Sequence, residues 1–212
     1  MSERPTCITI GPGRFSYAFV FKPKKNDDGT EKYSVTFLWS KKDKATTNKV
    51  KGAIEAAIEA DASGKRKLKG KTKGLKLPLR DGDEAREGDG AYEGMYFFTA
   101  NSNTAPGIAD KNKEEILDPR EFKSGDYGYI NVNFYAFGEK GNLGIAVGLN
   151  FIMKSKTGPA LTGGGGSIET AFEDIEIEES DDVEEFEEKP KVKKKKPKVK
   201  NYDEDGEGSE FF

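Results

Sequence analysis

The stretch "DYGYINVNFYAFGEKGNLGIAVGLNFIMK", residues 126–154, decides the fold class of this chain. It holds two runs rich in aromatic and β-branched residues, and in each run apolar side chains recur at every second position. This period is typical of half-buried strands. Residues 139–142, between the runs, are charged, small or polar and predict a hairpin turn. The stretch therefore predicts two antiparallel strands.

The first run has one apolar face and one face of aromatic and amide side chains. The apolar face, which can fill a core, consists of Ile130, Val132, Phe134 and Ala136. The opposite face consists of Tyr129, Asn131, Asn133, Tyr135 and Phe137. Rings offer stacking surfaces for bases, and amides offer donors and acceptors to base edges or sugars. The alternative is that loops cover this face and the tyrosines belong to the core.

The second run has a large apolar side and a side of small residues. The large side is predicted to consist of Leu143, Ile145, Val147, Leu149 and Phe151. The small side consists of Gly144, Ala146, Gly148 and Asn150. Small residues let another backbone or a ligand approach closely. The alternative is a barrel corner, where glycine relieves crowding.

Three further strands and one helix are predicted upstream. The strands are "RFSYAFVFKP" at residues 14–23, "KYSVTFLWSK" at 32–41 and "GMYFFTANS" at 94–102. In residues 46–62 the period changes, because Val50, Ile54, Ala57 and Ile58 fall on one helical face. Thr46 or Thr47 is the expected cap, and Gly64 is the expected stop. We therefore predict a mainly β fold, an OB-like five-stranded antiparallel barrel with one helix.

The composition excludes several kinds of chemistry. The 212 residues contain no histidine and one cysteine, Cys7. Ser-His-Asp and Cys-His catalysis, histidine-ligated zinc and an internal disulfide are therefore excluded. We expect a protein that is not an enzyme and that needs no metal or cofactor. Because no apolar run approaches about 18 residues, we expect no membrane span.

The charge is divided unevenly along the chain. Residues 1–160 carry 27 lysines and arginines against 21 acids, a net charge of +6, whereas residues 161–212 carry 8 against 17, a net charge of −9. The basic residues gather in "GKRKLKGKTKGLKLPLR", residues 64–80, which include Lys76 and Arg80. Such a cluster suits phosphate binding, because each contact releases condensed counterions. The alternative is an ordinary solvated surface.

Two other motifs indicate no ligand chemistry. The acidic stretch "RDGDEAREGDG", residues 80–90, lacks the spaced acidic ladder of an EF-hand, so we interpret it as a polar turn. Gly163 to Gly166 are followed by Ser167 with no lysine, which predicts a flexible linker and not a phosphate loop.

Residues 161–212 have the composition of a disordered tail. An acidic segment follows the glycines, then a lysine block that begins at Lys189 and ends at Lys200, and then an acidic end that closes with Glu210, Phe211 and Phe212. A tethered polyanion can compete with DNA for a cationic surface. The two phenylalanines, held in so polar a segment, are expected to fit an apolar pocket of a partner protein.

Four stretches resemble a family of bacteriophage single-stranded-DNA-binding proteins. They are "LKLPLRDGDE" (75–84), "AYEGMYFFTANSNTAPGI" (91–108), "DPREFKSGDYGYINVNFYAF" (118–137) and "GIAVGLN" (144–150). The resemblance covers most of the chain from Gly13 to Lys154. It implies an OB-fold DNA-binding domain at 1–160, and a tail at 161–212 that docks replication and repair proteins. The lysine block is a departure, since the acidic tails of this family usually lack one.

We therefore predict a sequence-tolerant single-stranded-DNA-binding protein for phage DNA replication and recombination. The predicted DNA-binding residues are Arg14, Tyr17, Trp39, Lys41, Lys76, Arg80, Tyr129, Asn131, Asn133, Tyr135 and Lys154. The predicted contacts to phage or host replication proteins are Glu210, Phe211 and Phe212. The expected location is the cytoplasm of the infected bacterial host, and a homodimer is left open.

Two other functions are compatible with the residues. The first is a chaperone-like or protein-interaction factor that acts through its charged tail, with the barrel as a scaffold. The second is a metal-dependent nuclease built on the acidic turn, which would cleave an oligonucleotide when magnesium is added. Binding of labelled oligo-dT separates the first from the DNA-binding prediction, and an intact oligonucleotide would exclude the second.

Overall fold

The structure of this chain is a computed structural model that describes residues 5–25, 29–63, 67–139 and 141–161. Except for Leu161, the predicted tail at 161–212, with Glu210, Phe211 and Phe212, lies outside the described residues. In chain order the elements are β1 (Cys7–Lys25), β2 (Glu31–Ser40), α1 (Lys44–Ser63), β3 (Arg80–Asp81), α2 (Gly82–Ala85), β4 (Met95–Ser102), β5 (Gly107–Ala109), the 3-10 helix η1 (Pro119–Glu121), β6 (Tyr127–Glu139) and β7 (Asn142–Lys156).

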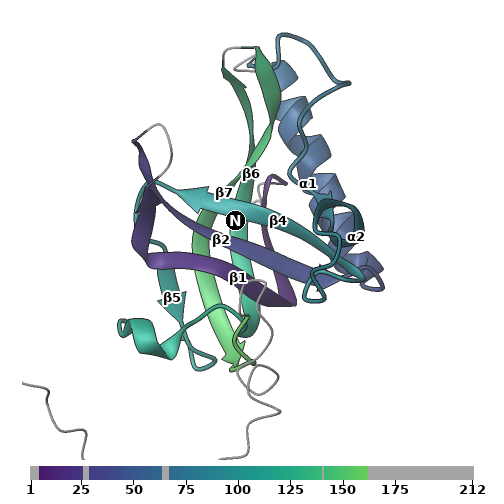
Figure 1. Cartoon of the computed structure of the whole chain (residues 1–212). Helices are drawn as coiled ribbons and strands as arrows, with labels where there is room; N and C mark the ends of the chain where they lie inside the picture. The colour runs from purple at the N-terminus through teal and green to yellow at the C-terminus, as the bar shows by residue number, and fades with distance from the viewer. Residues whose placement is uncertain (1–4, 26–28, 64–66, 140, 162–212) are drawn as a thin grey trace, which may run out of the picture. The chain divides into compact units, whose positions relative to one another are not determined.

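The five long strands close into a barrel (Figure 1). The sheet order is β3-β4-β2-β1-β6-β7-β5, and β4 also pairs with β7 through Asn101 and Gly148. This pairing joins the two sides of the sheet, so β1, β2, β4, β6 and β7 form a closed ring. The predicted OB-like barrel with one main helix is confirmed. The closing pair is parallel, and the short elements β3, β5, α2 and η1 were not predicted.

Aromatic side chains fill the barrel. The ring centroids of Phe15 and Phe37 lie 5.3 Å apart, those of Phe37 and Phe98 6.2 Å, and those of Phe98 and Phe134 5.9 Å. These rings come from four different strands, and all four are buried. Tilted and edge-on ring pairs at such separations add to the hydrophobic stabilisation of the core. Within the described residues, these rings therefore pack together in the centre of the barrel.

β1 is long enough to pair with two neighbouring strands. Its first half pairs with β6 and its second half with β2, and only residues near Arg14 pair with both. The register with β2 is irregular between Ser16 and Phe19, and Tyr17 between them has a φ of 47°. Such irregularities bend a strand and increase its twist. The bend lets β1 cross from one side of the barrel to the other.

α1 packs on β6 and β1 through the predicted face. Val50, Ala53, Ile54 and Ala57 are buried along it, and Ile58 packs at its margin. The N-cap is Asp43 and not Thr46 or Thr47, because the Asp43 carboxylate accepts a hydrogen bond from the Thr46 N–H at 3.0 Å. This bond lowers the pKa of Asp43. Gly64, the predicted stop, lies outside the described residues. Within the described residues, no helix is long and apolar enough to cross a membrane.

Candidate nucleic-acid interface

The outer face of β6 holds the aromatic and amide side chains predicted for it. We call this surface the β6 face, and it consists of Tyr129, Asn131, Asn133 and Tyr135. Ile130, Val132, Phe134 and Ala136 are buried on the other side of the strand, so the predicted alternation is confirmed. Tyr135 is 43% exposed, and the other three side chains are partly exposed. The tyrosines of the β6 face therefore lie outside the barrel core.

Phe151 also lies on the outer surface, and the prediction that it shares a side with Leu149 is wrong. Asn131 pairs with Phe151 while the next residue, Val132, pairs with Leu149, so Asn150 is an extra residue in β7. A bulge of this kind reverses the side on which the following residues point. Phe151 is therefore 62% exposed beside the β6 face.

A polar network holds the Asn131 amide in place. Its nitrogen donates to the Thr9 hydroxyl at 2.8 Å, and its oxygen accepts from the Asn150 amide at 2.9 Å. The Cys7 thiol lies 3.8 Å from the same oxygen. The amide that was predicted to meet base edges is thus already bonded to protein groups from β1 and β7.

The small residues of β7 let other parts of the chain approach the strand closely. This agrees with the first of the two interpretations of that side, close approach, and not with a barrel corner. A side chain at Gly144 would collide with the backbone oxygen of Lys76. The two chains are hydrogen-bonded there, since the Ile145 N–H donates to Lys76 at 2.9 Å. A side chain at Gly148 would collide with the amide of Asn133. The glycines therefore leave room for Lys76 of the basic segment and for Asn133 of the β6 face.

Two grooves adjoin the β6 face, one at each end. The Phe151 groove has a volume of about 440 Å³ and is lined by Thr9, Gly107, Ile108, Ala109, Lys113, Glu115, Tyr129, Asn131, Phe151, Ile152 and Met153. The Tyr135 groove has a volume of about 550 Å³ and is lined by Thr6, Ala57, Ala60, Asp61, Lys67, Asn133, Phe134, Tyr135 and Ala136. The β6 residues that line the two grooves run from Tyr129 to Ala136.

The described part of the basic segment, residues 67–80, is anchored beside the β6 face and here is called the lysine loop. Asp61 of α1 accepts the backbone N–H groups of Lys67 and Leu68 at 2.8 and 2.9 Å, and the Leu68 side chain is buried. Further on, Lys76 pairs with Gly144 of β7. The exposed cations of the loop are Lys67, Lys69, Lys71, Lys73, Lys76 and Arg80. The loop is therefore fixed beside β6 and β7 at Lys67, Leu68 and Lys76, and it ends at Arg80, which lies on β3 beside β4.

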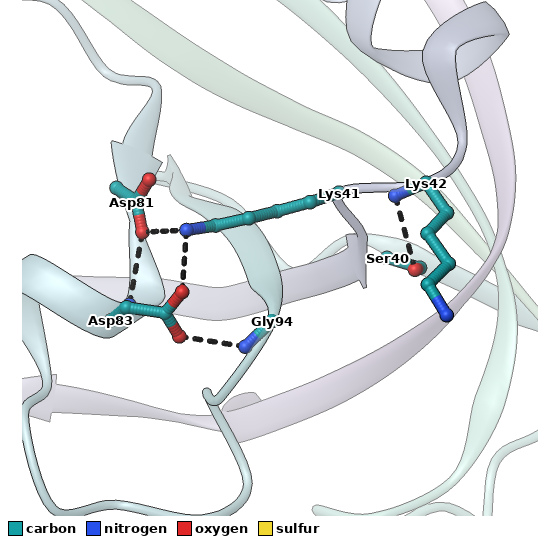
Figure 2. A network of polar contacts seen from close by, with 6 residues as sticks. All are labelled: Ser40, Lys41, Lys42, Asp81, Asp83 and Gly94. Carbon is teal, nitrogen blue, oxygen red and sulfur yellow. Dashed lines mark hydrogen bonds and ion pairs between the residues drawn. The ribbon is translucent and has the colours of Figure 1, made fainter.

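The acidic turn forms an ion-pair network around Lys41 (Figure 2). Both Asp81 and Asp83 contact the Lys41 ammonium, Asp83 at 2.7 Å, and Asp83 also accepts the Gly94 N–H at 2.7 Å. The pair with Lys41 lowers the pKa of Asp83, and the two carboxylates raise the pKa of Lys41. Among the described residues, no group of three or more acidic, histidine or cysteine side chains could hold a metal ion. Lys41 is thus held by carboxylates, and a phosphate would have to displace them.

A second pair of exposed rings lies on the second half of β1, which pairs with β2. Tyr17 is 42% exposed and Phe19 is also exposed, and we call them the β1–β2 face. A side-chain cation lies over each ring. The Arg86 guanidinium is 5.3 Å from the ring centroid of Tyr17, and the Lys24 ammonium is 5.6 Å from the ring centroid of Phe19. Cation–π contacts of this kind occupy one face of each ring.

Trp39 belongs to the core, which corrects its prediction as a stacking residue. Its side chain is 2% exposed, its ring lies 5.5 Å from that of Phe98, and its N–H donates to the Thr47 hydroxyl at 3.1 Å. The prediction failed because a tryptophan on a strand has the same sequence signature whether its face is inside or outside. No ring face of Trp39 is open to a base.

Arg14 and Lys154 also have structural partners. Arg14 donates to the backbone oxygens of Gly125 and Pro159 at 3.3 and 3.0 Å. Lys154 lies 3.0 Å from the carboxylate of Asp126. Of the predicted DNA-binding residues, the structure therefore groups Tyr129, Asn131, Asn133, Tyr135 and Lys76 around β6 and β7. It places Tyr17 on the β1–β2 face and Arg80 on β3, at the end of the lysine loop.

Comparison with known proteins identifies relatives among phage proteins. The family described as Enterobacter phage Enc34, ssDNA-binding protein, matches residues 6–185. Protein p50 of Acyrthosiphon pisum secondary endosymbiont phage 1 is 26% identical over 184 residues, which cover 83% of this chain and 97% of p50.

Two solved structures share the fold. The single-stranded DNA-binding protein from bacteriophage Enc34, in complex with ssDNA, matches with a TM-score of 0.66 and 24% identity over 74% of this chain and 90% of that one. The single-stranded DNA-binding protein gp2.5 of bacteriophage T7 matches with a TM-score of 0.54 and 14% identity over 76% of this chain and 97% of that one.

Proposed function

This chain belongs to the family of the Enterobacter phage Enc34 single-stranded-DNA-binding protein, and on that premise we propose that it binds single-stranded DNA along the β6 face without strong base preference. The observation that carries the proposal is the pair of outward-facing tyrosines on one strand, Tyr129 partly exposed and Tyr135 exposed, with the cationic lysine loop anchored beside that strand. Rings stack any base, and cations bind any phosphate. We propose a binding role and no catalysis.

Charge favours the β6 face over the surface formed by β2 and β4. OB folds often bind strands across their second and third barrel strands, which are β2 and β4 here. In this chain the loop beside that surface, residues 81–93, contains the acids Asp81, Asp83, Glu84, Glu87, Asp89 and Glu93 and one cation, Arg86. The lysine loop contains no acid. A polyanion is therefore attracted to β6 and repelled from the β2–β4 surface.

Fluorescence anisotropy with labelled oligo-dT tests the proposal. We expect binding that falls steeply with salt, because phosphate contacts release counterions. We also expect weaker binding of a duplex of the same length, because its bases present no free faces. Absence of binding at low salt would overturn the proposal and favour the protein-interaction role. Cleavage of the oligonucleotide when magnesium is added would show a nuclease.

Replacing Lys76 with glutamine should reduce the salt dependence of binding by one phosphate contact. The Lys76 side chain is exposed, and its ammonium donates to the Asn142 amide oxygen at 2.8 Å. The slope of log affinity against log salt should fall by about 0.7, the share of one phosphate in a single strand. Lys24→Gln, on the β1–β2 face, is the control and should leave the slope unchanged. The reverse pattern would place the strand on the β1–β2 face.

We further propose that the tail regulates binding and recruits partners during phage DNA replication and recombination in the cytoplasm of the infected host. The sequence supports this, because residues 161–212 carry −9 and are tethered to a body of +6. Glu210, Phe211 and Phe212 combine apolar and acidic groups that suit an apolar pocket with a basic rim. Their partner would be a phage or host replication protein.

Two truncations separate these roles of the tail. Ending the chain at Gly166 should strengthen oligo-dT binding, most at low salt, because it removes a tethered competitor. Removing only Phe211 and Phe212 should leave DNA affinity unchanged and abolish pull-down of replication proteins. Weaker DNA binding after the long truncation would mean that the lysine block, and not the acids, controls the tail. Unchanged pull-down after the short one would exclude the phenylalanines as the contact.

A further inference from the structure

We propose that the Phe151 groove holds one nucleobase of the bound strand by stacking and does not read its edges. This rests on the proposed function and adds a base site that lies beyond β6 itself. The groove shares Tyr129 and Asn131 with the β6 face. Tyr129 and Tyr135 are six residues apart, about 20 Å along a strand, so DNA that covers both must pass the mouth of the groove.

Both rings of the groove are positioned by glycines. A Cβ on Gly107 of β5 would lie 2.9 Å from the ring of Phe151, and a Cβ on Gly11 of β1 would lie 2.8 Å from the ring of Tyr129. A larger residue at either position would push the ring away from its place. Each ring therefore lies against a backbone on one side and contributes to the groove on the other.

The floor of the groove is apolar. Ile108 and Ile152 are buried beneath it, and Met153 is partly buried. The volume of about 440 Å³ lies within the range of small-ligand pockets, which are mostly apolar with a few polar groups. A flat heterocycle can enter such a space and exchange water for ring contacts. A phosphate cannot, because nothing on the floor would replace its hydration.

The polar groups around the groove do not read base edges. The Asn131 amide is bonded to Thr9 and Asn150, so its oxygen and one of its N–H groups are already occupied. Lys113 and Glu115 form the charged rim, where the ammonium can meet a flanking phosphate and the carboxylate repels one. This arrangement favours a base inside and the backbone outside.

The variant Phe151→Ala tests the site. We expect its affinity for labelled oligo-dT to fall by about 5- to 150-fold, the loss of one base stack. Because Phe151 is 62% exposed, its melting temperature should match that of the unmodified protein. Leu117→Ala is the control, since Leu117 is the more exposed apolar residue at 76% and lies outside the groove. Phe151→Trp should retain affinity.

Base identity provides a second readout. Phe151→Ala should bind oligo-dT, oligo-dC and oligo-dA more weakly than the unmodified protein does, by similar factors, because stacking depends little on base edges. A 2-aminopurine placed at one position of the oligonucleotide should be quenched by the unmodified protein and less by Phe151→Ala. If Phe151→Ala binds DNA normally, the proposal is wrong. If it binds DNA normally and also changes self-association or tail contacts, the groove serves a protein segment instead. If the unmodified protein binds no oligonucleotide, the proposed function itself fails.

Discussion

Replacing Asp126 with alanine is expected to lower the free energy of unfolding by about 3–5 kcal/mol, the cost of breaking a buried ion pair. The Asp126 side chain is 0% exposed. It accepts the Lys154 ammonium at 3.0 Å and the backbone N–H groups of Lys123 and Gly158 at 3.0 and 3.2 Å. Alanine would leave the two backbone N–H groups without their acceptor, and the Lys154 ammonium, which also donates to the Glu121 backbone oxygen, without its counter-charge.

Urea denaturation followed by tryptophan fluorescence measures this loss, because Trp39 is the one tryptophan and lies in the core. Arg120→Gln is the control, since it breaks the exposed pair that Arg120 makes with Asp118 at 2.7 Å. Its unfolding curve should match that of the unmodified protein, because surface pairs contribute little. A loss below about 1 kcal/mol for Asp126→Ala would show that water replaces the carboxylate.

The double variant Tyr129→Ala, Tyr135→Ala is expected to show the largest loss of DNA affinity. Each ring that stacks a base is worth about 1–3 kcal/mol of binding by alanine substitution. The two tyrosines lie about 20 Å apart along β6, so their losses should add to roughly 2–6 kcal/mol. Oligo-dT titration at several salt concentrations measures the loss. The salt slope should remain unchanged, because no charge is removed.

A matched double variant lies on the β1–β2 face. Tyr17 is 42% exposed and Tyr135 is 43% exposed, so Tyr17→Ala, Phe19→Ala removes comparable aromatic surface. We expect it to bind oligo-dT within about threefold of the unmodified protein, below the cost of one stack. Melting curves of both variants exclude a folding defect as the cause. If the β6 variant lost stability while its folded fraction bound normally, the tyrosines would be structural.

Periodicity predicted the parts of this fold that depend on local pattern. The alternation in residues 129–137 assigned each side chain of β6 to its face, and the 3.6-residue spacing in α1 found its buried stripe. Both succeed because a regular element has one geometry and burial follows it. The same logic failed at Phe151, because one extra residue at Asn150 reverses the faces and leaves no mark in a single sequence.

Residues whose role depends on distant partners could not be assigned from the sequence. Lys41 and Lys154 are of a residue type that often binds phosphate, but the fold brings Asp83 to Lys41 and Asp126 to Lys154. Trp39 was misplaced for a similar reason, since only the closed barrel decides which side of β2 is inside. Ion pairs across 42 and 28 residues of sequence carry no local signal.

Photocrosslinking of bound DNA tests the central claim, that the strand lies along the β6 face, most directly. Oligo-dT with 5-iodouracil at single positions would be bound, irradiated and digested with trypsin, which releases Tyr129 and Tyr135 in residues 124–140 and Tyr17 and Phe19 in residues 15–24. The account predicts that crosslinked nucleotide is found by mass spectrometry on residues 124–140. Crosslinks on residues 15–24, with none on residues 124–140, would contradict it.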